Sequence, residues 1–268
     1  MIVTQTRTNR TITRYLNGKI EKVDDVVATE KPFTIKLNEK EFATFVCTAE
    51  YIEDMVIGFL ASEGVIRKFT DIEDVWTQEK EGFVHVKTNY TNAFYEKFHS
   101  KRYITSCCGK SRQGFVFFND AKLSHHFKQV NVQLTYQDCF RLMEEMQTRS
   151  AVFQETGGVH NAALCTREGV LLSRLDIGRH NALDKIYGHC LRHQVPLEDK
   201  IIVFSGRISS EIVTKAAKIG CEIVLSKSAP TEMALELAEE LGMTTVGFIR
   251  NSSLNVYTRP DRIVEEID

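Results

Sequence analysis

The sequence is poor in proline, with four in 268 residues, and it contains a single tryptophan. No linker rich in proline, glycine or serine divides the chain, and no repeat is visible, so we expect a compact fold throughout. Apolar runs such as 201–204 are far shorter than the roughly 20 residues that a membrane-spanning helix requires. The start MIVTQTRTNR also lacks the apolar core of an export signal. We therefore expect a cytoplasmic protein without a membrane span.

The sequence also lacks a large excess of basic or acidic residues. With 34 basic and 36 acidic side chains the formal charge is −2, whereas nucleic-acid-binding domains are normally basic. We expect no nucleic-acid partner, and any anionic ligand has to be held by a local cluster of cations. Seven scattered cysteines argue against a disulfide scaffold. Because the separated cysteine pairs of structural zinc sites are also missing, we expect no metal.

The periodicity of apolar residues changes near residue 128. Before it, alternation predicts strands at 33–37, 42–48 and 83–86, with one helix that begins near Thr48 and ends at Gly64. After it, we predict helices at 135–149, 181–193, 209–219 and 231–241, between strands at 159–165, 170–177, 200–204, 222–225, 244–249 and 255–258. This order predicts an α/β domain (residues 129–268) with helices on both faces of a largely parallel sheet, after a smaller β-rich subdomain (residues 1–128).

Polar, glycine-bearing segments follow three successive predicted strands. Arg207 lies in the first segment, where Ser209 or Ser210 is a candidate helix cap. Lys227 lies in the second, with Thr231 as cap, and Arg250 lies in the third. Ligands of open α/β sheets bind outside the carboxyl ends of strands, where helix N-termini face anions. One such segment alone is more typical of a glycine turn with a serine cap. Three in succession favour a phosphate-rich pocket.

Two histidines have unusual neighbours. His160 and His180 each lie beside glycine and asparagine at a predicted strand boundary. A lone histidine is usually structural, but the repeated context makes both of them candidates for the pocket. In each case the residue two positions on is alanine, so the general-acid glutamate of a zinc deaminase is missing.

The sharpest local signal is ITSCCGKSRQ, residues 104–113. A nucleophilic thiol has to be an accessible thiolate in electropositive surroundings, and lysine and arginine at 101, 102, 110 and 112 surround Cys107 and Cys108. Adjacent Cα atoms lie about 3.8 Å apart, and disulfides prefer at least about 4.4 Å, so we expect free thiols or a modified sulfur. A half-buried structural pair and a Cys/His hydrolase are the alternatives. The other five cysteines are expected to be buried apolar residues.

In their order along the chain, TSCCGKS, TGGVHNAAL, DIGRHNALDK and SGRISSEIVTKAAKIG resemble the FdhD family of formate dehydrogenase accessory sulfurtransferases, over residues 25–263. The resemblance implies a cytidine deaminase-like α/β fold with an added N-terminal subdomain, usually as a homodimer. It implies a cytoplasmic sulfur carrier that takes persulfide sulfur from a cysteine desulfurase. The sulfur passes to molybdenum bis(molybdopterin guanine dinucleotide), bound as substrate, before that cofactor enters formate dehydrogenase.

The resemblance also implies site residues. The family motif is CxxC, whereas this chain has two adjacent cysteines, so we expect Cys107 to carry the persulfide, with Cys108 as the alternative. The family's cofactor-binding stretch falls on Ile249, Arg250, Asn251, Ser252, Ser253 and Leu254. We expect Arg207 and Lys227 to assist Arg250 with the pyrophosphates, and His160 and His180 to line the pocket. Asp184 or Glu211 is a candidate reader of the guanine. A cofactor-binding chaperone without sulfur transfer is the alternative function.

Overall fold

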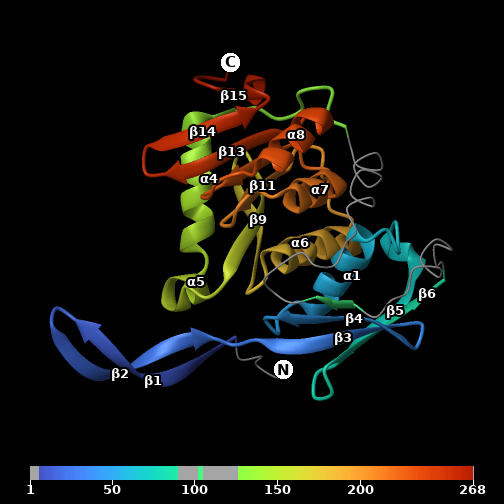
Figure 1. The fold of residues 1–268 in the computed structure, drawn as a ribbon. Coiled ribbons are helices and arrows are strands. Elements are labelled where there is room, and N and C mark those ends of the chain that lie inside the picture. The colour runs from blue at the N-terminus through green and yellow to red at the C-terminus, as the bar shows by residue number, and fades with distance from the viewer. Residues whose placement is uncertain (1–5, 90–101, 105–125, 268) are drawn as a thin grey trace.

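The structure is a computed structural model that describes residues 6–89, 102–104 and 126–267, with the backbone alone for 102–104. Its framework is a five-stranded sheet in the N-terminal half and a six-stranded sheet in the C-terminal half (Figure 1). The predicted α/β class is confirmed. No helix within these ranges is long and apolar enough to cross a membrane.

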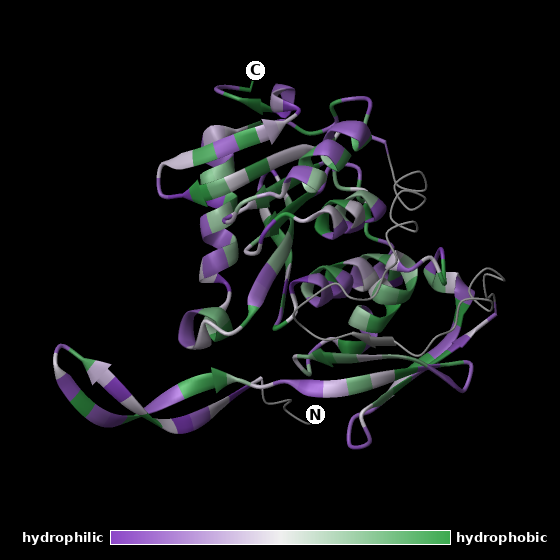
Figure 2. Cartoon of the chain, viewed as in Figure 1, coloured by the Kyte–Doolittle hydropathy of each residue, from purple (hydrophilic) through white to green (hydrophobic). Residues whose placement is uncertain are grey.

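A long hairpin precedes both sheets. Strands β1 (Arg7–Leu16) and β2 (Lys19–Ala28) pair along their whole length and project from the body as an arm (Figure 1). Asn17 and Gly18 between them both have positive φ, which two-residue hairpin turns require. Hydrophilic and hydrophobic bands alternate along the arm (Figure 2). The arm was not predicted from the sequence, because β1 carries few apolar residues and covers no core.

The five-stranded sheet has the order β5-β6-β3-β4-β7. Its strands are β3 (Lys31–Leu37), β4 (Lys40–Cys47), β5 (Ile72–Gln78), β6 (Phe83–Thr88) and β7 (Arg102–Ile104), with a 3₁₀ turn (Phe69–Asp71) before β5. Alternate side chains such as Phe33 and Ile35 form a core with helix α1 (Ile52–Ser62), since successive strand residues point to opposite faces. The strands are confirmed, but the helix begins at Ile52 and not near Thr48.

The six-stranded sheet has the order β10-β9-β11-β12-β13-β14. Its strands are β9 (His160–Thr166), β10 (Gly169–Asp176), β11 (Ile201–Phe204), β12 (Ile223–Ser226), β13 (Thr244–Arg250) and β14 (Ser253–Thr258). Strands β11, β12 and β13 are parallel, whereas β9, β10 and β14 run antiparallel to their neighbours. The prediction of a largely parallel sheet is therefore wrong. Two tight turns, β9–β10 and β13–β14, cause the difference, because short connections join antiparallel strands.

Helices cover both faces of this sheet, as predicted (Figure 1). Helices α6 (Arg179–His193), α7 (Ser210–Ile219) and α8 (Glu232–Leu241) share a core with Ile202 and Phe204, and α4 (Tyr136–Thr148) shares one with Ile201 and Val203. The short helix α5 (Ala151–Thr156) was not predicted. Strand β8 (Leu134–Thr135) pairs with β15 (Ile263–Val264), which follows a 3₁₀ turn (Pro260–Arg262).

Helix α1 packs on α6, so the two sheets are joined through this helix pair (Figure 1). The joint is close, because a side chain on Gly58 of α1 would overlap the backbone of α6. A division near residue 128 stays a prediction. The helix pair brings the end of β4 next to the turn between β10 and α6, where predicted site residues lie.

Candidate functional site

The segments that follow β11, β12 and β13 lie together at one end of the six-stranded sheet. The Ser205 amide donates to the Asn161 carbonyl (3.0 Å), the Lys227 amide to the Phe204 carbonyl (3.2 Å) and the Phe248 amide to the Ser228 carbonyl (3.2 Å). We call residues 160–161, 178–180, 205–209, 227–231 and 247–250 the strand-end site. The predicted meeting of the three polar segments is confirmed.

Ser228, and Ser226 next to the site, hold the loops to each other through their hydroxyls. Ser226 Oγ donates to the Gly206 carbonyl (2.7 Å), and Ser228 Oγ donates to the Ser205 carbonyl (3.0 Å). Ser226 Oγ also accepts from the Ser228 amide (3.0 Å). These hydroxyls are therefore part of the scaffold and leave the cations as the groups that can face a ligand.

The predicted helix caps are absent. Ser209 and Thr231 precede α7 and α8, but neither side chain accepts a hydrogen bond from the helix, and α6 follows Gly178, which has no side chain. By contrast, Thr135 and Ser150 cap α4 and α5 with their side chains. An uncapped helix leaves its first amide groups unpaired, and the helix dipole favours an anion there. Three such helix starts gather at the strand-end site.

His160 lies beside the start of the segment that follows β11. Ser205 Oγ accepts from the Asn161 amide (2.9 Å) and lies 3.5 Å from His160 Nδ1. Burial, followed by the positive charge of Arg179, lowers the pKa of His160. The ring is thus neutral near pH 7. Gly206 leaves room for the His160 and Phe204 rings, because a Cβ there would lie 3.3 Å from His160 Nδ1 and 2.8 Å from Phe204 Cζ.

His180 and the two predicted guanine-reading carboxylates are already paired. His180 Nε2 lies 2.7 Å from Glu211 Oε2, and this hydrogen bond lowers the pKa of Glu211. Asp184 is buried, accepts from Ser62 Oγ (2.9 Å) and pairs with Lys215. Burial raises the pKa of Asp184. Asp184 is covered and therefore cannot read a base, whereas this role for Glu211 stays a prediction.

A buried ion pair fixes the turn that carries Arg179 and His180. Asp176 Oδ2 accepts from Lys185 Nζ (2.7 Å) and from the amide and hydroxyl of Thr48 (3.0 Å each). Asp176 Oδ1 accepts from the Gly178 amide (2.8 Å) and Asn181 Nδ2 (2.9 Å). This network was not predicted from the sequence, although Asp176 and Lys185 lie among apolar residues at the start of a predicted helix.

The predicted cations lie on three segments of the strand-end site. Arg207 and Arg250 are exposed, and the Arg250 guanidinium lies 5.9 Å from the centre of the Phe248 ring. Lys227 Nζ donates to Gln147 Oε1 of α4 (3.0 Å). Phe248 has a φ of 53°, a left-handed conformation that bulky side chains rarely adopt and that often marks functional sites.

The predicted cofactor-binding stretch forms the end of β13 and the turn into β14. Ile249 is buried in the core, so its side chain is covered, and Leu254 packs against the same core. Asn251, Ser252 and Ser253 are exposed, and Ser253 Oγ donates to the Arg250 carbonyl (3.3 Å). Within this stretch the polar groups of the turn are the ones that face solvent.

Five cysteines lie in the described part of the chain, and all five are buried. Burial raises the pKa of Cys47, Cys139 and Cys165 to about 12 and that of Cys190 to about 11, and it also raises the pKa of Cys221. Such thiols are inert, which confirms the expectation for these five. Cys107 and Cys108 lie outside the described residues.

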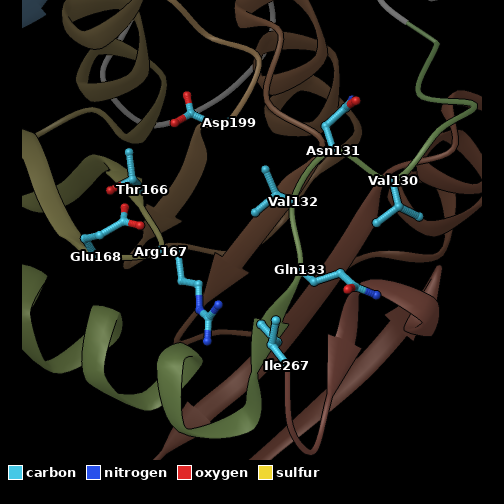
Figure 3. A pocket seen from close by; sticks show the side chains of 9 residues that line it. All are labelled: Val130, Asn131, Val132, Gln133, Thr166, Arg167, Glu168, Asp199 and Ile267. Carbon is cyan, nitrogen blue, oxygen red and sulfur yellow. The ribbon is translucent and has the colours of Figure 1, made fainter.

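A cavity of about 300 Å³ lies away from the strand-end site, and Figure 3 shows the residues that line it. It is lined by residues 130–133, the β9–β10 turn at 166–168, Asp199 and Ile267. Asp199 precedes β11, whereas Ser205 follows it, so the cavity is at the opposite end of that strand from the strand-end site. It contains none of the predicted site residues. No group of three or more histidine, cysteine or acidic side chains in the described ranges is arranged to hold a metal.

Comparison with known proteins places the chain among relatives of similar length. The sequence profile of the FdhD/NarQ family matches residues 28–264. The chain belongs to this family. Members named sulfur carrier protein FdhD are 54% identical to it, in Shouchella clausii over 96% of this chain and 97% of that protein, and in Bacillus subtilis strain 168 over the same shares.

The family fold is also represented among solved structures. A crystal structure described as a formate dehydrogenase accessory protein, from Desulfotalea psychrophila, is similar with a TM-score of 0.80 and 23% identity. The aligned region covers 97% of this chain and 100% of the chain in that crystal structure. At this identity the likeness concerns the fold, and it extends over both sheets.

Proposed function

We propose that this chain is a sulfurtransferase that accepts persulfide sulfur from a cysteine desulfurase on Cys107 or Cys108. The sulfur is delivered to molybdenum bis(molybdopterin guanine dinucleotide), held as substrate at the strand-end site, for use by formate dehydrogenase. Relatives named sulfur carrier protein support this proposal. It includes a cytoplasmic homodimer and cytidine deaminase-like layering of the C-terminal half.

The burial of the other five cysteines is the observation that carries the proposal. Their thiols are covered, and their raised pKa values keep them protonated at neutral pH. A sulfur carrier needs an accessible thiolate. Sulfur chemistry in this chain therefore falls on Cys107 and Cys108, which basic residues surround in the sequence.

The strand before the cysteine pair runs toward the strand-end site. Strand β7 is parallel to β4 and pairs Ile104 with Phe45. Three residues after Phe45, Thr48 binds Asp176, just before the turn that carries Arg179. Cys107 follows Ile104 by three residues, which is a reach of about 10 Å for an extended chain. Residue 104, the last described one before the cysteine pair, therefore lies on the strand beside β4, whose end contacts the turn between β10 and α6.

The first step is an exchange of sulfur between two thiols. The thiolate of Cys107 or Cys108 attacks the outer sulfur of the desulfurase persulfide, an S–S bond to the carrier cysteine forms, and the donor's S–S bond breaks. The donor cysteine leaves as a thiolate, so no external oxidant or reductant is needed. Basic residues near the carrier keep its persulfide ionised and nucleophilic.

The strand-end site has the charge that a dinucleotide substrate requires. The starts of α6, α7 and α8 lack side-chain caps, and Arg207, Lys227 and Arg250 lie on the adjoining segments. Helix starts and guanidinium groups are the usual partners of phosphate. We therefore assign the pyrophosphates to this end of the sheet.

Mass spectrometry after incubation with a cysteine desulfurase and cysteine tests the carrier step. A gain of one sulfur on residues 104–113, removed by reductant, is expected, and Cys107→Ser and Cys108→Ser identify the carrier. Cys190→Ala is the matched control and keeps the gain. In cells that lack their own copy, the double cysteine variant should fail to support formate dehydrogenase activity. Full activity with it would contradict the proposal and favour a cofactor-binding chaperone.

A further inference from the structure

Asn161 has a buried side chain without a hydrogen-bond partner. The residue is 0% exposed, and neither Oδ1 nor Nδ2 is bonded. Ten buried side-chain atoms lack a hydrogen bond in the described ranges, and five of them belong to the strand-end site: both atoms of Asn161, Arg179 Nε, Ser209 Oγ and His180 Nε2. Of these five, His180 Nε2 has an ion-pair partner in Glu211. Buried polar groups are nearly always paired, and a bare one destabilises a fold. Its presence at this end of the sheet calls for a function.

The direction of the Asn161 side chain follows from the alternation of β9. Ala163 and Cys165 belong to the core under α4, whereas Ala162 belongs to the core under α6, α7 and α8. Asn161 therefore points to the α4 side. Lys227 points the same way, because its Nζ binds Gln147 of α4.

Asn161 and Lys227 also stand at the same level of the sheet. Phe204 of β11 pairs with Ala162 of β9 on one side and with Ser226 of β12 on the other. The next residue, Ser205, thus lies between Asn161 and Lys227. Two strand spacings of about 4.8 Å set the backbones of Asn161 and Lys227 about 10 Å apart. An amide without a hydrogen bond and a cation therefore lie on the same face of the sheet, with one strand between them.

A carboxamide offers a donor and an acceptor in one plane. It is complementary to a lactam edge, in which a ring carbonyl accepts and the neighbouring ring N–H donates. Guanine and pterin both carry this edge. We infer that Asn161 binds the lactam edge of the heterocycle that this chain takes as ligand, with Lys227 on the phosphate side. The inference rests on the proposed function and names the group that recognises its substrate.

A buried water is the simpler partner for a bare amide, and the two cases differ in their consequences. If a water is the hydrogen-bond partner of Asn161, replacement by leucine of similar size leaves ligand binding unchanged. If the ligand is the partner, the same replacement removes both hydrogen bonds to the ligand without disturbing the fold. Because the amide is covered in the free chain, binding also has to open its surroundings, and association slower than diffusion is expected.

Calorimetric titration of the full chain with guanosine diphosphate and with 6-hydroxymethylpterin tests the inference. The Tm of Asn161→Leu should equal or exceed that of the native chain, and its affinity for at least one of these probes should be at least tenfold lower. The probe whose affinity falls identifies the heterocycle. Thr77→Val is the matched control, since Thr77 Oγ1 is also a buried orphan but lies in β5. It should leave both affinities unchanged.

A modified ligand tests the same hydrogen bonds with the native chain, so the result does not depend on whether a variant folds. 1-Methylguanosine diphosphate lacks the lactam N–H and should bind at least tenfold more weakly than guanosine diphosphate if guanine is the heterocycle. Unchanged binding of both probes to Asn161→Leu would overturn the role of Asn161 alone. If the native chain binds neither probe, the proposed substrate is wrong, and the inference is overturned with it.

Discussion

Gly58 and Gly188 face each other where α1 crosses α6. A Cβ atom on Gly58 would lie 2.7 Å from the Gly188 amide nitrogen, and one on Gly188 would lie 2.8 Å from the Gly58 amide nitrogen. The distance between packed helices depends on the side chains at the contact. With glycine on both sides the two backbones touch, and the N-terminal sheet is held against the helix that starts at the strand-end site.

Alanine at position 188 should therefore destabilise the chain. Its Cβ would overlap the Asp54 carbonyl oxygen, and overpacking of this kind costs about 3 kcal/mol. Without the clash, replacing glycine by alanine would stabilise a helix by about 1 kcal/mol. The sign of the change in the free energy of unfolding therefore shows whether the clash exists. Denaturant unfolding of Gly188→Ala should show a lower midpoint. A higher midpoint would mean that the helices do not cross this closely.

Loss of the buried cation at Lys185 should be more costly than loss of a surface one. Lys185→Met leaves the Asp176 carboxylate charged and buried without its counterion, which costs about 3–5 kcal/mol. Arg149→Met is the control, because its 2.6 Å bond to Glu145 joins partly exposed side chains one helical turn apart, and such pairs contribute about 0.5 kcal/mol or less. Chemical unfolding measures both. Equal losses would contradict the role given to the Asp176 network.

Local patterns in the sequence were sufficient for most of the C-terminal half. The apolar spacing of α7 and α8 predicts both helices, and each ends at a glycine with positive φ, Gly220 and Gly242. Periodicity and glycine helix ends act within a few residues, so one sequence shows them, whereas the predicted side-chain caps Ser209 and Thr231 are not formed. The predicted meeting of the strand ends follows from the same local order and a general property of α/β sheets.

Interactions between distant residues could not be read in this way. Thr48 looks like a helix cap in its local sequence, yet it binds Asp176, 128 residues away. The pairing of His180 with Glu211 and the bare amide of Asn161 likewise depend on which strands are neighbours. The expected largely parallel sheet failed for the same reason, since strand direction is set by connections and by distant packing.

The stability of the chain should depend on the charge of His160. Burial and the charge of Arg179 lower its folded-state pKa below the usual 6.5, so between that value and about 6.5 the unfolded chain binds more protons. The free energy of unfolding therefore falls as the pH drops through this window and is unaffected above it. Unfolding at pH 7.5 and 5.5 should show a smaller loss for His160→Gln than for the native chain. If the free energy of unfolding falls equally in both chains, the His160 ring is not held in a buried, neutral form.

Arg250 is the exposed cation of the turn that the family resemblance assigns to the cofactor. A charge-assisted hydrogen bond contributes about 1.5–3 kcal/mol, so Arg250→Gln should weaken guanosine diphosphate binding about 10- to 100-fold. Its Tm should stay unchanged, because the side chain is exposed. Arg10→Gln, on the exposed arm, loses the same charge and should bind normally. The affinity of the Arg250 variant should also depend less on salt, since screening acts on the charge removed. Calorimetric titration at two salt concentrations measures both effects, and native affinity in Arg250→Gln would place the phosphates elsewhere.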